Sequence, residues 1–333
     1  MDRPKIVVTN PVHPDVLDLL QTRCTVAVNH ESNPWSDSKI LTHMRDAVGM
    51  IAFMSDRIDG QFLDQCENLR IIGGVLKGFD NFDVQACTDR GIWFTVVQET
   101  LTVPTVELTV GLMIAISRHI VEADAQVRRG HQGWRPILYG LGLQHSTVGI
   151  LGMGAIGQAL ANRLKAFECQ ILYFDYEPCF HVPDMTFASL DDVLKSDFVV
   201  VALPLTARTQ HLLNSRTLRS MKSSAYLINT ARGSIVDEEA VADALINDRL
   251  AGYAADVFEL EDWSRADRPK GISSRLLSNK SRTVLTPHLG SAERHARRTA
   301  ELEIAHSILD CLDGRMPRGA VNNPMARNAG AKC

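Results

Sequence analysis

The chain has 333 residues, of which 45% are hydrophobic and 22% are charged, an ordinary mixture for a globular protein. A chain of this length exceeds one ordinary core, so we expect two domains. The formal net charge of -4 provides no overall basic field, which argues against a nucleic-acid partner. It does not exclude an anionic substrate, because a site can be basic within an acidic protein.

The sequence predicts neither a membrane span nor a metal site. No segment approaches the roughly 20 apolar residues that cross a bilayer, and residues 1–9 lack the apolar core of a signal peptide. The seven cysteines are scattered, without a CxxC or Cys/His cluster. We therefore expect reduced thiols in a cytoplasmic protein.

Short β-branched runs alternate with amphipathic stretches, a pattern typical of parallel sheets with helices on both faces. In the first block we expect helices that include Pro14–Gln21 and Asp59–Cys66. The strands expected there are Lys5–Thr9, Thr25–Asn29, Gly49–Ala52, Ile71–Gly74 and Trp93–Thr95. A long helix, Val103–Arg129, follows, and then a loop, Gly130–Leu143, that is rich in glycine and aromatic residues.

A second block of six strands follows, with helices between them. The expected strands are Thr147–Leu151, Gln170–Phe174, Phe198–Leu203, Ala225–Asn229, Gly252–Asp256 and Thr283–Leu285. We expect a helix over Ile156–Phe167, directly after the first of these strands. Another long helix, Ala292–Leu312, comes after Pro287, and we expect it to return to the first block.

The segment GMGAIG, residues 152–157, joins an expected strand to an expected helix. In this setting Gly152 permits a tight turn, Gly154 lets backbone approach a pyrophosphate, and Gly157 allows close packing of helix on strand. The amino end of the helix offers free N–H groups to phosphates. The order of strand, glycine motif and helix therefore indicates a dinucleotide site, whereas a glycine-rich turn without a ligand is the alternative.

Asp175 ends the next expected strand, 18 residues beyond Gly157. An acid there accepts hydrogen bonds from the adenosine ribose and repels a 2′-phosphate, so NAD is favoured over NADP. Asp256 could hydrogen-bond the nicotinamide carboxamide or could cap a helix. The candidate cofactor contacts are Gly152, Gly154, Ala155, Ile156, Gly157, Asp175, Leu203, Pro204, Thr105, Thr230, Ala231, Asp256 and Gly290.

These observations predict an α/β protein of two doubly wound parallel-sheet domains with a cleft between them. Residues 101–290 form a Rossmann NAD-binding domain, which includes a crossing helix and the Gly-rich loop. Residues 1–100 and 291–333 form a discontinuous, flavodoxin-like substrate domain.

Arg232, Glu261 and His288 lie at or just past the ends of successive strands of the second block. The carboxyl edge of such a sheet is where ligands bind. Arginine offers a planar, permanently charged fork to an oxyanion, histidine moves a proton near neutral pH, and a carboxylate orients the histidine. Singly, each residue is better explained as a surface or loop side chain. Beside the glycine motif, the three together indicate hydride-transfer catalysis.

The glycine motif, NTARGSIVDEEA (229–240), DVFELED (256–262) and TPHLGS (286–291) resemble the D-isomer-specific 2-hydroxyacid dehydrogenases, in order and over nearly the whole chain. The resemblance implies a two-domain NAD-dependent oxidoreductase and a homodimer. It also implies that Arg232 binds the substrate oxyanion and that His288, paired with Glu261, is the acid and base.

Four segments resemble the phosphonate (phosphite) dehydrogenase branch of that family more closely. They are AFMSDR (52–57), LKGFDNFD (76–83), LTVPTVEL (101–108) and GYAADVFELEDWSRADRP (252–269). The branch implies oxidation of phosphite to phosphate. Typical hydroxyacid enzymes carry a small uncharged residue where Lys77 stands, and phosphite, largely a dianion, needs a second cation beside Arg232. Asp175 departs mildly from the glutamate expected in this branch.

The same resemblance implies further substrate contacts. Gly78 lets backbone come close, Met54 shapes the pocket, and Asp80 orients Lys77 or its loop. Trp134, Tyr139 and Ser291 help to position substrate, and the two aromatic residues could come from the partner subunit or simply pack at a dimer interface. By default Lys77 is an exposed loop lysine and Met54 a core methionine.

Two other functions remain open on the sequence. The first is an NAD-dependent D-2-hydroxyacid dehydrogenase of the glycerate, hydroxypyruvate or lactate type. The second is an NAD-sensing binding protein on this fold, like the C-terminal binding protein corepressors, which keep the same Arg, Glu and His.

Overall fold

The computed structural model describes residues 3–131, 138–179, 184–263 and 265–325. The chain forms two compact units. Unit 1 consists of Met1–Leu101 and Glu293–Cys333, and unit 2 consists of Thr102–Ala292. Each unit is an α/β structure built on one parallel sheet. The first unit is therefore discontinuous in sequence, since its last helix comes from the C-terminal part of the chain.

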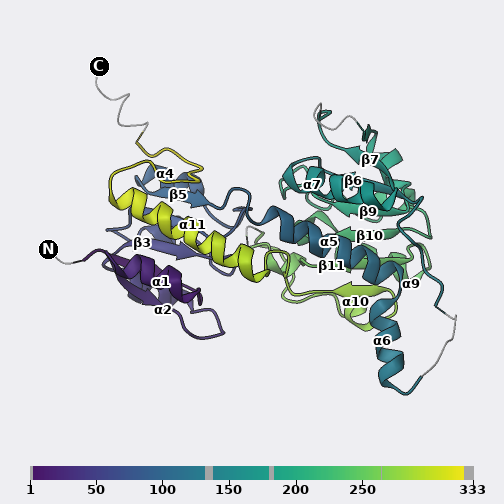
Figure 1. The fold of residues 1–333 in the computed structure, drawn as a ribbon, viewed down its shortest axis with the longest axis horizontal. Helices are drawn as coiled ribbons and strands as arrows, with labels where there is room; N and C mark the ends of the chain where they lie inside the picture. The colour runs from purple at the N-terminus through teal and green to yellow at the C-terminus, as the bar shows by residue number, and fades with distance from the viewer. Residues whose placement is uncertain (1–2, 132–137, 180–183, 264, 326–333) are drawn as a thin grey trace. The chain divides into compact units, whose positions relative to one another are not determined.

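Unit 1 contains a five-stranded sheet in the order β2-β1-β3-β4-β5, with every neighbouring pair parallel. The strands are β1 (Lys5–Val8), β2 (Thr25–Val28), β3 (Ala47–Ala52), β4 (Ile71–Gly74) and β5 (Trp93–Val96). The helices are α1 (Pro14–Gln21), α2 (Asp37–Met44), α3 (Gly60–Leu63), α4 (Val84–Asp89) and α11 (Arg294–Leu312). Helix α11 packs on α1 and on strand β4 (Figure 1).

Unit 2 contains a seven-stranded parallel sheet in the order β12-β11-β10-β9-β6-β7-β8. Its strands are β6 (Thr147–Leu151), β7 (Gln170–Phe174), β8 (Thr186–Phe187), β9 (Phe198–Val201), β10 (Tyr226–Asn229), β11 (Gly252–Ala255) and β12 (Thr283–Leu285). Its helices are α5 (Thr102–Ser117), α6 (Ile120–Arg128), α7 (Ala155–Leu164), α8 (Leu190–Leu194), α9 (Glu238–Ile246) and α10 (Ser274–Ser278). Four short 3₁₀ helices are η1 (Lys165–Phe167), η2 (Thr217–Ser220), η3 (Gly233–Ile235) and η4 (Glu259–Glu261).

The sheet of unit 2 is buried on both faces, which explains its continuously apolar strands. Successive side chains of a strand point to opposite faces. In β9, Phe198 and Val200 join the core under α5 and α7, whereas Val199 and Val201 join the core on the other face. Helix α5 runs across β10 and β11 (Figure 1). The α/β architecture with two parallel sheets confirms the predicted fold class.

The expected single helix Val103–Arg129 is wrong in one respect. Helix α5 ends at Ser117, and α6 begins at Ile120. His119 between them has φ 53°, in the left-handed region that a right-handed helix cannot continue through. The sequence shows no glycine or proline at this point, so nothing local marks the break.

Other element ends also differ from the expectation. Asp59 is the N-cap residue of α3 and accepts a hydrogen bond from the N–H of Phe62, so the helix begins at Gly60. It ends at Leu63 and is therefore shorter than the predicted Asp59–Cys66. The helix after the glycine motif ends at Leu164 and tightens into a 3₁₀ turn. The second sheet gains a seventh strand, the two-residue β8, which is too short to give a pattern in the sequence.

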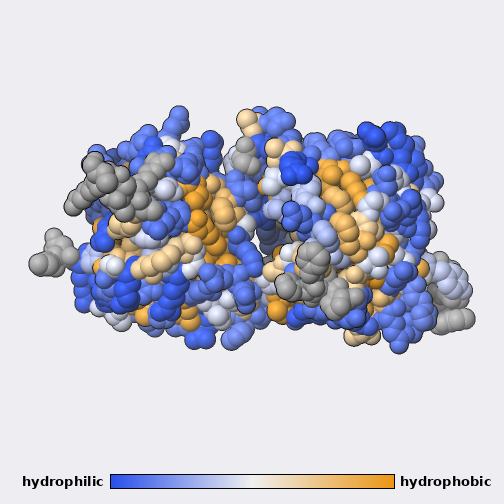
Figure 2. All heavy atoms as spheres, turned by 90° about the horizontal axis from the view of Figure 1, so that it is seen from above, coloured by the Kyte–Doolittle hydropathy of each residue, from blue (hydrophilic) through white to orange (hydrophobic). Residues whose placement is uncertain are grey.

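On the face drawn in Figure 2, hydrophilic residues cover most of the surface and hydrophobic residues form smaller areas. Among the described residues, no helix combines the length and apolar character that a membrane crossing requires. Helix α6 buries none of its residues, and three of its apolar side chains are exposed: Ile120, Val121 and Val127.

Asp56 of unit 1 is a buried carboxylate without a cationic partner among its hydrogen bonds. Its side chain is 4% exposed and accepts from the Thr9 hydroxyl and from the N–H of Phe53 at 2.8 Å. Burial raises the pKa of Asp56 to about 6, against the partial opposition of these two hydrogen bonds. The charged form is therefore disfavoured in the folded state.

Because this pKa is higher in the folded than in the unfolded chain, stability is lost as the pH rises from about 4 to about 6. Asp56→Asn removes this dependence, and we expect the variant to gain on the order of 3 kcal/mol relative to wild type over that interval. Thermal unfolding of both proteins between pH 4 and 8 measures the difference. Asp18→Asn, at an exposed carboxylate, is the control. A pH-independent difference for Asp56→Asn contradicts the prediction.

Candidate active site

The glycine motif forms a tight turn between β6 and α7. Gly152 has φ 101°, donates to the carbonyl of Phe174 at 2.8 Å, and lies so close to Ala202 that a Cβ would be 2.6 Å from its carbonyl oxygen. A side chain at this position would therefore be strained and would clash. Gly154 is the N-cap residue of α7, and no side chain caps that helix.

The space at this turn fits a dinucleotide. A Cβ built on Gly154 meets nothing within 4 Å, so the backbone is open to a ligand. The first N–H groups of α7 have no side-chain acceptor, and the helix dipole places positive potential there. Ala155 is exposed and Ile156 is half-buried at the same helix start. These groups would hold a pyrophosphate.

Asp175 directly follows β7 and its carboxylate turns toward the glycine turn. Oδ2 accepts from the N–H of Met153 at 2.8 Å, and Oδ1 accepts from the N–H of Tyr176 at 2.7 Å. Each oxygen retains a lone pair for a ribose hydroxyl. The acid is thus held beside the turn by two backbone donors.

The remaining cofactor candidates lie on the loops after β9 and β10 and at the start of α5. Leu203 is buried in the core, and Pro204 is exposed. The hydroxyl of Thr230 lies 2.8 Å from that of Thr109 on α5, next to the half-buried Ala231. The Thr105 hydroxyl donates to the carbonyl of Gly290 at 3.3 Å.

His288 and Glu261 form a hydrogen-bonded pair. Nδ1 of His288 lies 2.6 Å from Oε2 of Glu261, and Oε1 of Glu261 accepts from the N–H of Phe258 at 3.1 Å. Both side chains are partly exposed, at 32% for the histidine and 25% for the glutamate. The carboxylate places the Nδ1 proton between the two residues, so Nε2 is the nitrogen that can exchange a proton with a ligand.

Asp256 holds the loop that carries His288. It is buried and follows β11. Oδ1 accepts from the Thr286 hydroxyl at 2.6 Å and from the N–H of Leu289 at 2.7 Å, and Oδ2 accepts from the N–H of Gly290 at 2.7 Å. The left-handed backbone of His288, with φ 55°, is fixed within this loop. The alternative that Asp256 caps a helix is wrong, because η4 is capped by Phe258.

Arg232 follows β10 on a turn that lies against the segment 258–259. A Cβ on Gly233 would be 1.9 Å from the carbonyl carbon of Phe258, so only glycine allows this approach. Asn229 donates from its side chain to the carbonyl of Arg232 at 2.9 Å and shapes the turn. The Arg232 guanidinium donates to the carbonyl of Ala231 at 2.8 Å and is half-buried.

A second arginine, which sequence reasoning did not single out, ties these two segments together. Arg265 donates to Oε2 of Glu259 at 2.5 Å and to the Ser234 hydroxyl at 2.8 Å. His211 lies 2.8 Å from the same Glu259 oxygen, and Asp262 accepts from the N–H of Ser234 at 2.6 Å. The segment after Glu261 therefore fixes the turn that carries Arg232. In the sequence, the only signal for this contact is the cluster of charged residues in that segment.

The candidate substrate residues of unit 1 lie just after strands β3 and β4. Met54 is half-buried after β3, while Lys77 and Gly78 are half-buried after β4, followed by Asp80. Arg297 of α11 donates to the carbonyl of Val75 at 3.2 Å and lies over the Phe53 ring at 5.3 Å. The sequence did not predict that Arg297 lies near these loops, because its position depends on how α11 packs on unit 1.

The three other candidate substrate residues lie outside the loops after β3 and β4. Ser291 is half-buried next to Gly290, and Tyr139 is 81% exposed. Trp134 lies outside the described residues. Within the described part of the chain, no group of three or more His, Cys, Asp or Glu side chains is arranged to hold a metal ion.

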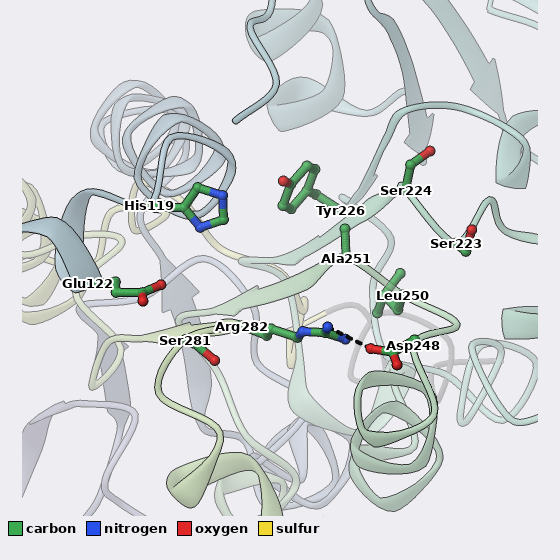
Figure 3. A pocket seen from close by; sticks show the side chains of 10 residues that line it. All are labelled: His119, Glu122, Ser223, Ser224, Tyr226, Asp248, Leu250, Ala251, Ser281 and Arg282. Carbon is green, nitrogen blue, oxygen red and sulfur yellow. Dashed lines mark ion pairs between the residues drawn. The ribbon is translucent and has the colours of Figure 1, made fainter. Parts of the chain in front are cut away.

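A cavity of about 510 Å³ opens at the opposite edge of the sheet in unit 2 (Figure 3). Most of its lining residues lie just before or at the start of β10, β11 or β12, and two lie at the start of α6; the lining residues are His119, Glu122, Ser223, Ser224, Tyr226, Asp248, Leu250, Ala251, Ser281 and Arg282. Arg282 is paired with Asp248 at 2.6 Å. The cavity is therefore separate from the edge that carries the glycine turn and His288, where such sheets bind ligands.

Comparison with known proteins identifies the family. The model of the D-isomer specific 2-hydroxyacid dehydrogenase, NAD binding domain, matches residues 110–290. The chain belongs to the D-isomer specific 2-hydroxyacid dehydrogenase family. A glyoxylate reductase from Thermofilum pendens is 40% identical over 338 residues, which cover 98% of this chain and 97% of that protein.

Solved structures of similar proteins share this fold. The TT0316 protein from Thermus thermophilus superposes with a TM-score of 0.88 at 36% identity, over 96% of this chain and 100% of that one. An NADPH-dependent glyoxylate/hydroxypyruvate reductase from Sinorhizobium meliloti, in complex with NADP and malonate, gives a TM-score of 0.83 at 28% identity, over 96% and 97%.

This family member is an NAD(P)-dependent oxidoreductase of the 2-hydroxyacid dehydrogenase type. The names of these relatives support the 2-hydroxyacid alternative better than the expected phosphite oxidation. The expected preference for NAD over NADP is supported only in the coarser form of an NAD(P) site, since one relative was solved in complex with NADP.

Arg265→Ala tests the link between the 259–267 segment and the Arg232 turn. We expect kcat/KM to fall about tenfold or more, because a displaced Arg232 no longer meets the substrate anion. Arg265→Lys should recover part of the loss. The control is Arg275→Ala, which removes exposed ion pairs with Glu239 and Asp243 in the same unit and should change kcat/KM by less than about twofold. Unchanged kinetics in Arg265→Ala would contradict the positioning role.

Proposed function

We propose that this dehydrogenase oxidises phosphite to phosphate and transfers hydride to NAD. The observation that carries the proposal is Lys77, a cation at the carboxyl end of β4. Small uncharged residues are typical at this place in hydroxyacid enzymes, whose substrates carry a single negative charge. A lysine is suited to the second charge of phosphite. The resemblance of segments 76–83 and 252–269 to the phosphite branch points the same way.

The chemistry balances as phosphite plus water plus NAD giving phosphate, NADH and a proton. The oxygen of water forms a bond to phosphorus while the P–H bond breaks. The hydrogen of that bond leaves as hydride, and NAD is the acceptor. Lys77 and Arg232 bind the phosphite oxygens, Arg232 through two guanidinium N–H groups. Nε2 of His288 takes the proton from water, and Glu261 holds the ring in the tautomer that permits this. Fixed charges and proximity supply much of the rate.

The candidate groups are divided between the two units. Residues 102–292 supply the glycine turn, Arg232, Glu261 and His288, and thus the cofactor and catalytic functions. In unit 1, Gly78, Met54 and Asp80 would serve as substrate contacts along with Lys77. In unit 2, Ser291 next to the loop of His288 would do so. Tyr139, an exposed aromatic side chain, would contact substrate or a second subunit.

The second candidate is reduction of glyoxylate or hydroxypyruvate. The names of relatives at 28–40% identity favour it. The same groups suit this reaction. Arg232 would bind the carboxylate of the 2-oxo acid, and protonated His288 would donate to the carbonyl oxygen as hydride arrives.

A substrate panel separates the two candidates. We expect NADH to form from NAD and phosphite, with glyoxylate, hydroxypyruvate, D-glycerate and D-lactate turned over far more slowly. Lys77→Ala should lower kcat/KM for phosphite about a hundredfold, because one of two substrate cations is lost. Lys39→Ala, an exposed lysine of the same unit, is the matched control.

Turnover of the 2-oxo acids alone, with NADH consumed, would establish the second candidate and leave the Arg, Glu and His roles intact. Absence of turnover on every substrate, with NADH binding retained, would instead favour an NAD-sensing binding protein.

We also propose that the enzyme is a homodimer joined through α6. Its exposed Ile120, Val121 and Val127 are the kind of apolar side chains that subunit contacts cover. Light scattering should give the mass of two chains for wild type and of one chain for the Val121→Asp/Val127→Asp variant. A monomeric wild type at micromolar concentration would overturn the proposal.

A further inference from the structure

An arginine is stacked on the tryptophan that lies two residues after Glu261. The guanidinium carbon of Arg268 is 3.9 Å from the centroid of the Trp263 ring. Trp263 is 38% exposed and Arg268 is half-buried. A guanidinium over a ring is attracted by the negative face of the ring, and its N–H groups, which lie in its own plane, can still donate hydrogen bonds. The stack therefore orients the arginine and leaves its edge able to bind another group.

The edge of Arg268 binds the backbone directly before Glu261. Its Nε donates to the carbonyl of Leu260 at 3.0 Å. The Leu260 side chain is partly buried against the apolar core of unit 2, so this contact joins the loop to a closely packed part of the unit. Arg268 therefore connects the residue before Glu261 with an aromatic ring after it.

The backbone after Glu261 is constrained as well. The N–H of Trp263 donates to the carbonyl of Glu261 at 3.0 Å and closes a three-residue turn. Asp262, between them, is buried, and its Oδ2 accepts from the N–H of Ser234 at 2.6 Å. Because both neighbours of Glu261 are held, a shift of its backbone breaks at least one of these contacts.

The position of Glu261 matters because His288 depends on it. Oε2 of Glu261 lies 2.6 Å from Nδ1 of His288. Both side chains are partly exposed, so water competes for this hydrogen bond when the carboxylate is displaced. A neutral imidazole carries its proton on either nitrogen, and only the form protonated at Nδ1 leaves Nε2 as a proton acceptor. Displacement of the carboxylate therefore lowers the fraction of His288 that is ready to accept a proton.

We propose that Arg268, stacked on Trp263, is a positioning residue that holds Glu261 in place for His288. The proposal rests on the roles of Glu261 and His288 in the proposed function and deepens it, since it names the groups that fix this pair. It is separate from the contacts of Arg265, which fix the neighbouring turn.

The first test observes the hydrogen bond itself and needs no substrate. In protein with isotopically labelled histidine, a proton held between Nδ1 of His288 and a carboxylate gives a downfield resonance, and His288→Asn assigns it by removing it. We expect Arg268→Ala to speed the exchange of this proton with water about tenfold. Arg268→Lys, which keeps a cation for the ring of Trp263, should retain most of the protection.

Arg208→Ala is the matched control, because Arg208 is also stacked on an aromatic ring of unit 2. Its guanidinium carbon lies 4.0 Å from the centroid of the ring of Tyr176, which follows β7. This variant should leave the Nδ1 proton of His288 unchanged. An equal change in both variants would show a general loosening of the unit and would overturn the proposal, as would an unchanged proton in Arg268→Ala.

Steady-state kinetics provide a second readout, with phosphite and NAD or, if the substrate panel selects that reaction, with glyoxylate and NADH. Arg268→Ala should lower kcat about tenfold and change the KM values less than about twofold, because proton transfer is impaired while anion binding is kept. Trp263→Phe, which keeps a ring under the arginine, should lower kcat less than Trp263→Ala. A raised KM with unchanged kcat would contradict the proposal.

The dependence on Glu261 separates positioning from a general structural role. In a Glu261→Gln background, Arg268→Ala should change kcat less than about twofold, because the charged partner of His288 is already lost. A further tenfold loss in that background would overturn the proposal. Absence of turnover on both phosphite and glyoxylate would contradict the proposed function, and the Nδ1 proton would then still decide whether Arg268 holds Glu261.

Discussion

The parallel alignment of the strands in unit 2 decides where every candidate catalytic and cofactor group of that unit lies. The carboxyl ends of parallel strands meet at one edge, so residues far apart in sequence become neighbours there. Gly152 after β6, Asp175 after β7, Arg232 after β10 and Asp256 after β11 all follow this rule. The 510 Å³ cavity at the other edge shows the converse, because most of its lining residues lie just before or at the start of a strand.

The candidate catalytic residues are held by other side chains of unit 2. Asp256 accepts three hydrogen bonds from the loop of His288, and Arg265 links Glu259 to the turn of Arg232. Hydride transfer requires reacting groups held within fractions of an ångström, and such supporting contacts supply that fixation. The close approach at Gly233 belongs to the same arrangement, since it brings the arginine turn onto the segment before Glu261.

Family membership and substrate choice depend on different parts of the molecule. In the proposed function, the glycine turn and the Arg, Glu and His set suit any small anion that exchanges hydride with a nicotinamide, and the family as a whole is shown by the match to its NAD binding domain. In our proposal the substrate is selected by a few charges, above all by Lys77 after β4. One additional cation changes the preferred ligand from a monoanion toward a dianion without altering the fold.

The sequence by itself determined the alternating elements, the glycine motif, the acid at Asp175 and the order of Arg232, Glu261 and His288, because each is a local pattern or lies at the end of an apolar strand. Only the tertiary structure decided where the long helix breaks, since His119 adopts a left-handed backbone without any local signal. It also decided which residues Asp256, Arg265 and Arg208 contact. Their partners lie 6 to 34 residues away in the chain, or across to a neighbouring strand, and such contacts form only when the sheet brings the loops together.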